Sequence, residues 1–186
     1  VHIASPDQTL RLGYLPETAD SPLWKITAHA GSTVLPRWQV TFDKPTPTEI
    51  VQDFTSALAT AYTEGPDSYL HPTITQAGFD AGTPLTAAGW RPRPSMNEVS
   101  FHSPDGLAEV RLHLKRLDRH AEMEDQQRWL TTAGFERNQW RATATSLTPE
   151  SLVIAMNTAI ADTSPVVRYG GDLPFLPPEA TVTPVK

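Results

Sequence analysis

The chain has 186 residues and a formal net charge of -6, with 39% hydrophobic and 19% charged residues. This composition is ordinary for a globular protein, and the length allows one sizeable core or two small ones. The absence of cysteine excludes disulfides, thiolate nucleophiles and Cys-based metal sites. No apolar run approaches the roughly 18 residues that a membrane span needs, and the start does not resemble a signal peptide. We therefore expect a cytoplasmic protein without a membrane segment.

The first part of the chain alternates apolar and polar residues in short segments, which predicts β-strands. Four strands are expected, at residues 1–4, 10–14, 24–28 and 37–42. Ser5-Pro6-Asp7 lies between the first two strands and has the composition of a turn. The first two strands should therefore form a hairpin.

A helix is predicted to follow the fourth strand. Thr46 is expected as its N-cap and Pro47 as its first residue, with Glu49 completing a capping box. The apolar stripe of this helix is expected to consist of Ile50, Val51, Phe54, Leu58 and Ala61. This stripe should pack on one face of the strands.

The same elements recur in the second part of the chain in the same order. Strands are expected at 99–102, 110–114, 129–133 and 139–144, with Ser103-Pro104-Asp105 repeating the turn. Thr148 and Pro149 repeat the predicted helix start. The second apolar stripe is Leu152, Val153, Met156, Ala159 and Ile160. Five matching elements predict a tandem duplication of a unit with four strands and one helix, a ββββα unit.

We therefore predict an α+β fold with pseudo-twofold symmetry, in which two units pack as one body and each twisted antiparallel sheet is covered by a helix. The first unit should span residues 1–70 and the second residues 90–163, with a connecting segment at 71–89. Residues 164–186 are rich in proline and are expected to be extended. The sequence leaves open whether this tail lies on the surface or is partly disordered.

The sequence carries no catalytic signature, neither a nucleophile elbow nor a phosphate-binding loop. His102 and His113 could face each other across the second hairpin, near Glu98 or Glu109, but exposed polar residues explain them more simply. A solvated loop is expected for an acidic cluster beside several cations. That cluster and its neighbours are Glu122, Glu124, Asp125, Arg119, His120 and Arg128. We expect no enzymatic activity, no metal and no cofactor.

The alternation also predicts how charge is distributed between the two faces. Four tryptophans follow the parity of the apolar residues and should lie beneath the helices: Trp24, Trp38, Trp129 and Trp140. The opposite parity carries seven Lys or Arg residues against three acids, whereas the remaining acids fall mostly in helices and loops. A mildly basic sheet face suits contact with phosphates, although an ordinary solvated face explains the same residues.

Residues 5–70 carry the pattern SPD…LGYLP…W.I.A…W…FD..TPTEIV..FT.ALA…GPD.YL. This pattern resembles the actinobacterial domain-of-unknown-function-317 family, which is named for an SPDY-type motif. The second copy resembles the same family at 88–90, 103–106 and 140–144. In architecture, a repeated ββββα unit is similar to the Whirly, PUR-repeat and PC4-like folds. That likeness implies two units in one body and binding of single-stranded nucleic acid.

From these features we predict non-enzymatic binding of single-stranded DNA or RNA across the sheet faces turned away from the helices. The predicted contact residues are Arg11, Lys25, Arg37, Arg111, Lys115 and Arg141. The alternative is a protein–protein adaptor that uses an exposed sheet or the proline-rich tail. The net negative charge and the lack of aromatics on that face favour the adaptor. The identity of the partner and the formation of a homo-oligomer stay open.

Overall fold

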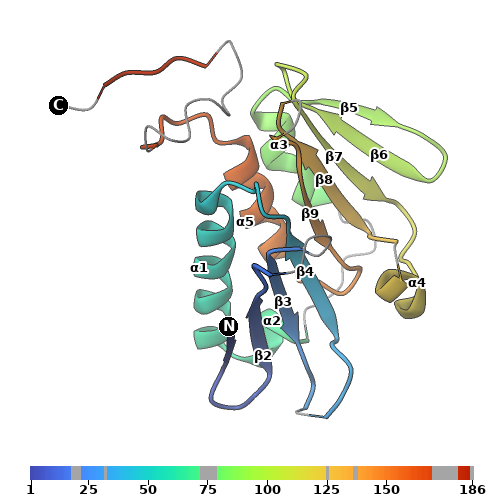
Figure 1. Cartoon of the computed structure of the whole chain (residues 1–186). Coiled ribbons are helices and arrows are strands. Elements are labelled where there is room, and N and C mark those ends of the chain that lie inside the picture. The colour runs from blue at the N-terminus through green and yellow to red at the C-terminus, as the bar shows by residue number, and fades with distance from the viewer. Residues whose placement is uncertain are drawn as a thin grey trace.

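A single antiparallel sheet organises the molecule. The computed structural model describes residues 1–17, 22–31, 33–71, 79–124, 126–135, 138–168 and 180–184. Within these residues nine strands pair in the order β1-β2-β3-β4-β9-β8-β7-β6-β5. Helices α1 and α5 pack against each other on one face of this sheet (Figure 1). The α+β class that the sequence predicts is therefore confirmed.

The first half of the chain supplies one side of the sheet and the second half supplies the other. The first half contains β1 (His2–Ala4), β2 (Leu10–Tyr14), β3 (Trp24–Ala28), β4 (Trp38–Phe42), α1 (Thr48–Glu64) and α2 (Pro66–Tyr69). The connection contains η1 (Phe79–Gly82) and α3 (Thr83–Ala87). The second half contains β5 (Arg91–Pro94), β6 (Glu98–His102), β7 (Ala108–His113), α4 (Arg119–Glu124), β8 (Trp129–Ala133), β9 (Trp140–Ala144) and α5 (Glu150–Ala161). All eight predicted strands are present, whereas β5 and α4 were not predicted.

The two halves share one sheet, which differs from the expectation of a separate sheet under each helix. Strand β4 pairs with β9 in antiparallel register, with Thr41 opposite Thr143. The Oγ1 atoms of these two threonines lie 2.6 Å apart and form a hydrogen bond. Each strand is the last of its half, so its outer edge has backbone groups that need partners. Pairing the two edges satisfies those groups and brings both helices onto the same face.

The Ser-Pro-Asp segments form the predicted hairpin turns, with matching hydrogen bonds in the two halves. Ser5 Oγ donates to Asp7 Oδ1 at 2.5 Å and accepts from the Leu10 N–H at 3.0 Å. Ser103 Oγ likewise donates to Asp105 Oδ1 at 2.6 Å and accepts from the Ala108 N–H at 2.9 Å. The hydrogen bond from Ser5 holds the pKa of Asp7 below its ordinary value.

The tryptophans lie on the helix-covered side, as their parity predicts. Trp38, Trp129 and Trp140 are buried there, and Trp38 Nε1 donates to the Tyr69 carbonyl at 2.7 Å. Trp24 is half-buried and packs against Tyr14, with ring centroids 4.7 Å apart. Buried aromatic rings of this size contribute much of the apolar area that a small core removes from water.

Both long helices begin one residue later than predicted. Pro47 has φ -53° and ψ 132°, an extended conformation, and it precedes the first helical residue without a side-chain cap. Pro149 has the same conformation before α5. The Thr46 hydroxyl is buried and has no hydrogen-bond partner in the described part of the chain, and Glu49 pairs with Arg168 instead of closing a capping box. The predicted N-caps Thr46 and Thr148 are therefore wrong.

Strand β5 was missed because its sequence, Arg-Pro-Arg-Pro, argues against a strand. It is an edge strand, so a proline that lacks an N–H can lie there without leaving a neighbouring strand unpaired. Of the predicted tail, residues 164–168 and 180–184 have no regular secondary structure, and the rest lies outside the described residues. None of the helices in the described ranges is long and apolar enough to cross a membrane.

Candidate nucleic-acid interface

The face of the sheet opposite α1 and α5, called the open face below, carries an uninterrupted row of side chains across the strands. We call it the middle row: Lys25, Thr41, Thr143, Leu130, Arg111, Ser100 and Arg93, each paired with the next by strand register. The row covers six strand spacings, or about 29 Å. Its cations lie toward the two ends and its hydroxyl groups lie between them.

A second row runs beside the middle row, at the end of the sheet where β9 begins. It consists of Arg141, Thr132, Glu109, His102 and Arg91. Arg141 Nε lies 3.5 Å from Asp43 Oδ2, and two thirds of the Arg141 side chain stays exposed. Glu109 lies 3.9 Å from both His102 Nε2 and Arg111 Nε. Asp43 and Glu109 therefore each lie beside an arginine, which offsets their negative charge.

The strand register separates the two histidines that the sequence suggested might meet. His102 lies opposite Glu109 and His113 lies opposite Glu98, so the two imidazoles belong to opposite ends of the hairpin. In the part of the chain that the structure describes, no three His, Asp or Glu side chains are grouped as a metal site would require.

The structure brings only some of the predicted contact residues together. Lys25 and Arg111 belong to the middle row, and Arg141 belongs to the row beside it. Arg11 lies on β2 opposite Thr27, one row away on the other side. The last two lie outside the strands: Arg37 precedes β4 and is half-buried, and Lys115 follows β7 and is exposed.

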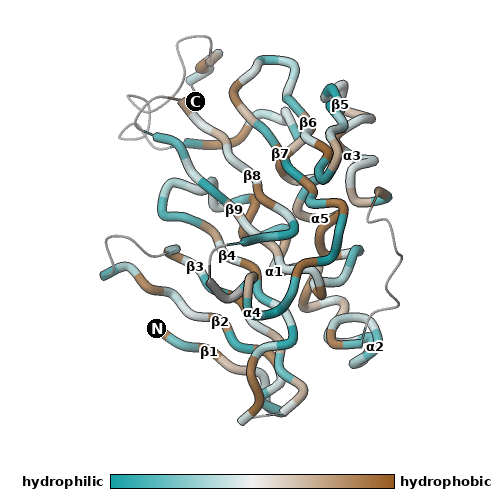
Figure 2. Tube along the Cα trace, turned by 90° about the vertical axis from the view of Figure 1, so that its right-hand side faces the viewer, coloured by the Kyte–Doolittle hydropathy of each residue, from teal (hydrophilic) through white to brown (hydrophobic). Residues whose placement is uncertain are grey.

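Helix α4 covers one end of the open face, where the sequence predicts a solvated loop. Arg119 donates to the Pro36 carbonyl at 2.6 Å, and Glu122 Oε1 accepts from the Ser146 N–H at 2.5 Å. Figure 2 shows the open face with α4 in front of the sheet and α1 and α5 behind it. The solvated-loop prediction is wrong for Glu122, which is buried; Asp125 and the side chain of Glu124 lie outside the described residues.

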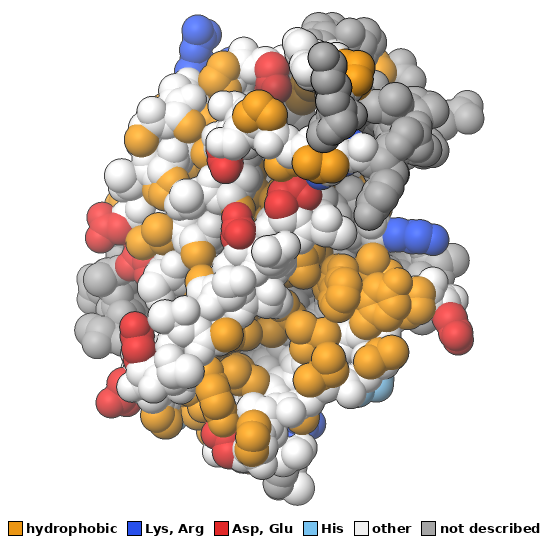
Figure 3. All heavy atoms as spheres, turned by 90° about the vertical axis from the view of Figure 1, so that its left-hand side faces the viewer, with side chains coloured by type: hydrophobic (Ala, Val, Ile, Leu, Met, Phe, Trp, Pro, Cys, Tyr) orange, Lys and Arg blue, Asp and Glu red, His pale blue; other side chains and the backbone are white. Residues whose placement is uncertain are grey.

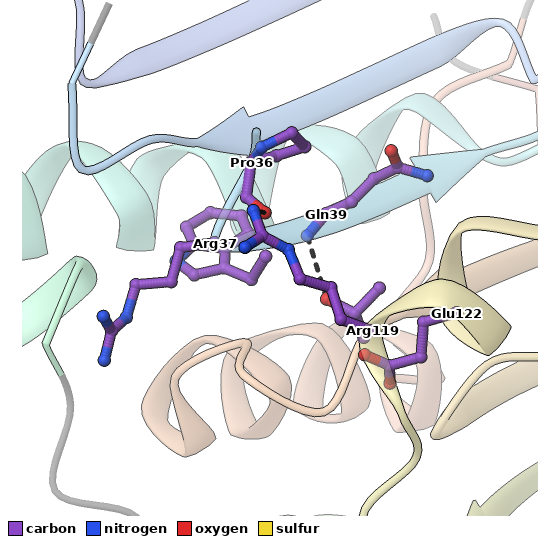
Figure 4. A pocket seen from close by; sticks show the side chains of 7 residues that line it. Pro36, Arg37, Gln39, Arg119 and Glu122 are labelled. Carbon is purple, nitrogen blue, oxygen red and sulfur yellow. Dashed lines mark hydrogen bonds between the residues drawn. The ribbon is translucent and has the colours of Figure 1, made fainter. Parts of the chain in front are cut away.

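A small cavity lies between α4 and the start of β4. Its volume is about 20 Å³, close to that of one water molecule, so it cannot admit a larger ligand. Figure 4 shows Arg119 reaching toward Pro36, whereas the Arg37 guanidinium points away from Arg119. The cavity is therefore a gap in the packing of α4, and any contact from Arg37 must be made outside it.

Two charged side chains are buried beneath α4. Burial raises the pKa of Glu122 above its ordinary value, although the hydrogen bond from Ser146 and the charge of Arg128 oppose this shift. Burial lowers the pKa of Arg128, and two of its guanidinium nitrogens have no hydrogen-bond partner within the described ranges. The alternation of side chains along the strands predicted that Arg128 lies among the cations of the open face, but Arg128 is buried beneath α4 and shielded from a ligand.

Charge is segregated between the two sides of the molecule. Helices α1 and α5 contain Glu49, Asp53, Glu64 and Glu150 but no Lys or Arg. Figure 3 views the molecule from the α1 side, where acidic side chains are scattered over the surface and Lys and Arg appear mainly at its margin. Arg168, which lies near the start of α1, is paired with Glu49. The exposed cations of the strands lie on the open face.

Two cations of this face were missed from the sequence. Arg91 and Arg93 lie on β5, are exposed, and share the open face with their partners His102 and Ser100. The alternation of arginine with proline was the available signal, because residues two apart in a strand point to the same side. The prolines concealed it, since they argue against a strand.

Two segments of the chain match one known protein family. A family model described as SPDY: Domain of unknown function (DUF317) matches residues 4–63 and 102–166. The two segments together cover more than half of the chain, and they confirm the resemblance that the sequence motifs carry. No curated protein and no solved structure matches the chain.

Proposed function

The chain belongs to the SPDY family of domains of unknown function, and from this premise we propose that it binds single-stranded DNA or RNA, without catalysis, on the open face of its sheet. One observation carries the proposal: exposed Lys and Arg residues lie on the open face, whereas both long helices on the other side carry acids and no Lys or Arg. A protein with net charge -6 can attract a polyanion only through such segregation.

The chemistry of the face indicates contact with the phosphate backbone and not with bases. Arginine and lysine side chains bind phosphates, and threonine hydroxyls can donate to them. In the described part of the open face, the side chains of the middle row include no aromatic ring on which a base could stack. We therefore expect weak to moderate affinity, strong dependence on salt and little sequence preference.

We further propose that the chain arose by tandem duplication of a ββββα unit and that its two units resemble those of the Whirly, PUR-repeat and PC4-like folds. The equal order of four strands and a helix, the matching hydrogen bonds of the two Ser-Pro-Asp turns and the two family-model matches support the duplication. Pairing of β4 with β9, related strands of the two units, supports a pseudo-twofold arrangement.

Binding of a fluorescent oligothymidine measured across a range of salt concentrations tests the proposed function. Lys25→Gln should weaken binding and reduce the salt slope by about 0.7 to 1, because one phosphate contact is lost. Gln52→Glu changes the net charge equally on the exposed side of α1 and should have a much smaller effect. Absence of binding at low salt, or equal effects of the two variants, would contradict the proposal.

An apolar groove supports a second candidate, the protein–protein adaptor. The groove has a volume of about 340 Å³ and lies between α1 and the edge of the sheet, lined by Ile3, Leu10, Leu12, Leu58 and Tyr62 among others. Figure 3 shows apolar side chains gathered on this side of the molecule. An extended apolar peptide could pair with the outer edge of β1 and place side chains in the groove. If so, Ile3→Asp should abolish binding of such a peptide and leave oligonucleotide binding unchanged.

A further inference from the structure

Strand β5 extends the open face to the edge of the sheet opposite β1. Arg91 and Arg93 are exposed at the far edge of the sheet, and β6 and β7 separate them from the β8–β9 region at the centre. Lys25 lies on the other side of that centre, on β3. The middle row therefore begins and ends near exposed cations that come from the two halves of the chain.

The position of α4 and the continuity of the middle row favour a ligand that crosses the strands. Along a strand, α4 blocks one end of the face near β4 and β9, as the Arg119–Pro36 and Glu122–Ser146 hydrogen bonds show. Across the strands, the row continues for about 29 Å and contains no acidic residue, with exposed Lys25 and Arg93 at its ends and the buried Thr41 and Ser100 between them. A stacked single strand that advances about 3.4 Å per nucleotide would place about eight nucleotides over this distance.

We propose that one nucleic-acid strand lies along the middle row, perpendicular to the β-strands, with Arg91 and Arg93 of β5 binding its phosphates at one end and Lys25 at the other. This inference rests on the proposed function and specifies the direction of the ligand, the length of the site and two contact residues. The two arginines lie two residues apart on one strand and point to the same side, so both guanidinium groups can reach phosphates at the same end of a chain that crosses β5.

A length series of oligodeoxyadenosines, whose bases stack on one another, tests the inference at low salt. For the unaltered protein, affinity should rise with length up to about eight nucleotides and then level off. In Arg91→Gln/Arg93→Gln the rise should stop at a shorter length, and the longest oligonucleotide should bind on the order of tenfold more weakly. Gln52→Glu/Thr63→Glu, which changes the net charge equally on α1, should keep the length dependence of the unaltered protein.

The outcomes separate the inference from the function on which it rests. If the β5 variant and the unaltered protein share one length dependence while Lys25→Gln still weakens binding, the nucleic-acid function stands and the proposed path is wrong. A plateau at about four nucleotides in the unaltered protein would also overturn the path. If the unaltered protein binds no oligonucleotide, the proposed function itself fails. Thermal unfolding of each variant verifies that both exposed arginines can be replaced without loss of the fold.

Discussion

The Ser-Pro-Asp turn shows how a few side chains set a local conformation. One serine hydroxyl both donates to the aspartate and accepts from a backbone N–H at the start of the next strand. Thr9 adds a second donor to the same Asp7 oxygen, at 2.8 Å, and its hydroxyl also contacts Tyr69 OH at 2.8 Å. The turn is thereby tied to α2 as well as to its own hairpin.

Ser5→Ala removes the first donor to Asp7 and is expected to reduce the free energy of unfolding by about 1 kcal/mol. The pKa of Asp7 is lowered in the folded protein, so its contribution to stability is present above the unfolded-state pKa and is lost as the pH falls through the folded-state pKa. The variant should raise this pKa toward its ordinary value and weaken that loss in acid. An NMR titration of the Asp7 carboxyl measures the shift, and Ser103→Ala should leave it unchanged.

The buried Glu122 has the opposite pH dependence. Its pKa is raised in the folded protein, so its contribution is most favourable below the unfolded-state pKa and is lost as the pH rises through the folded-state pKa. Glu122→Gln keeps an oxygen for the Ser146 N–H but removes the charge. The stability of the variant relative to the unaltered protein should therefore increase from acid to neutral pH. Denaturant unfolding across this range measures the difference in stability. If the variant instead lost stability relative to the unaltered protein as the pH rises, the attraction between Glu122 and Arg128 would outweigh the cost of burying the carboxylate.

At the scale of elements, the decisive contact is the pairing of β4 with β9. It joins the two halves into one sheet and lets α1 and α5 pack against each other. Thr41 and Thr143 lie at the middle of this pairing with their hydroxyls 2.6 Å apart. Both also belong to the middle row, so the junction of the halves lies within the proposed binding surface.

Thr41→Val should destabilise the protein by about 1 kcal/mol, because it leaves the Thr143 hydroxyl without its partner. Thr41→Val/Thr143→Val should recover most of this loss, since two apolar side chains of similar shape replace the bonded pair. Chemical unfolding of both single variants and the double variant gives the coupling energy directly. Additive effects of the two substitutions would mean that the two hydroxyls do not interact.

Elements with strong local signals could be predicted from the sequence, and elements decided by tertiary contacts could not. The alternation in Trp24–Ala28 and Trp129–Ala133 predicted these strands because one face of each is buried. The helix starts were predicted one residue early because Pro47 has the φ of a helix but an extended ψ. Strand β5 is stabilised by pairing with β6 although its prolines argue against a strand, and α4 is held by the buried Glu122–Ser146 contact, so both depend on contacts with distant residues.

At the scale of the whole molecule, parity predicted the candidate site only in part. It correctly separated the tryptophan side from the face that carries Lys25, Arg111 and Arg141. It could not show that α4 returns over the sheet and buries Arg128, because that depends on long-range packing. For the same reason the two halves were expected as separate sheets, although one continuous surface offers a longer path for a polyanion.

The central claim is that a nucleic-acid strand binds the open face, and an NMR titration of the labelled protein with an oligothymidine of about eight nucleotides tests it most directly. The account predicts that backbone and guanidinium signals change on β3, β5, β7 and β9, around Lys25, Arg93 and Arg111, while those of the exposed side of α1 stay in place. Changes centred on α1, α5 or the groove beside β1, or no change at low salt, would contradict it.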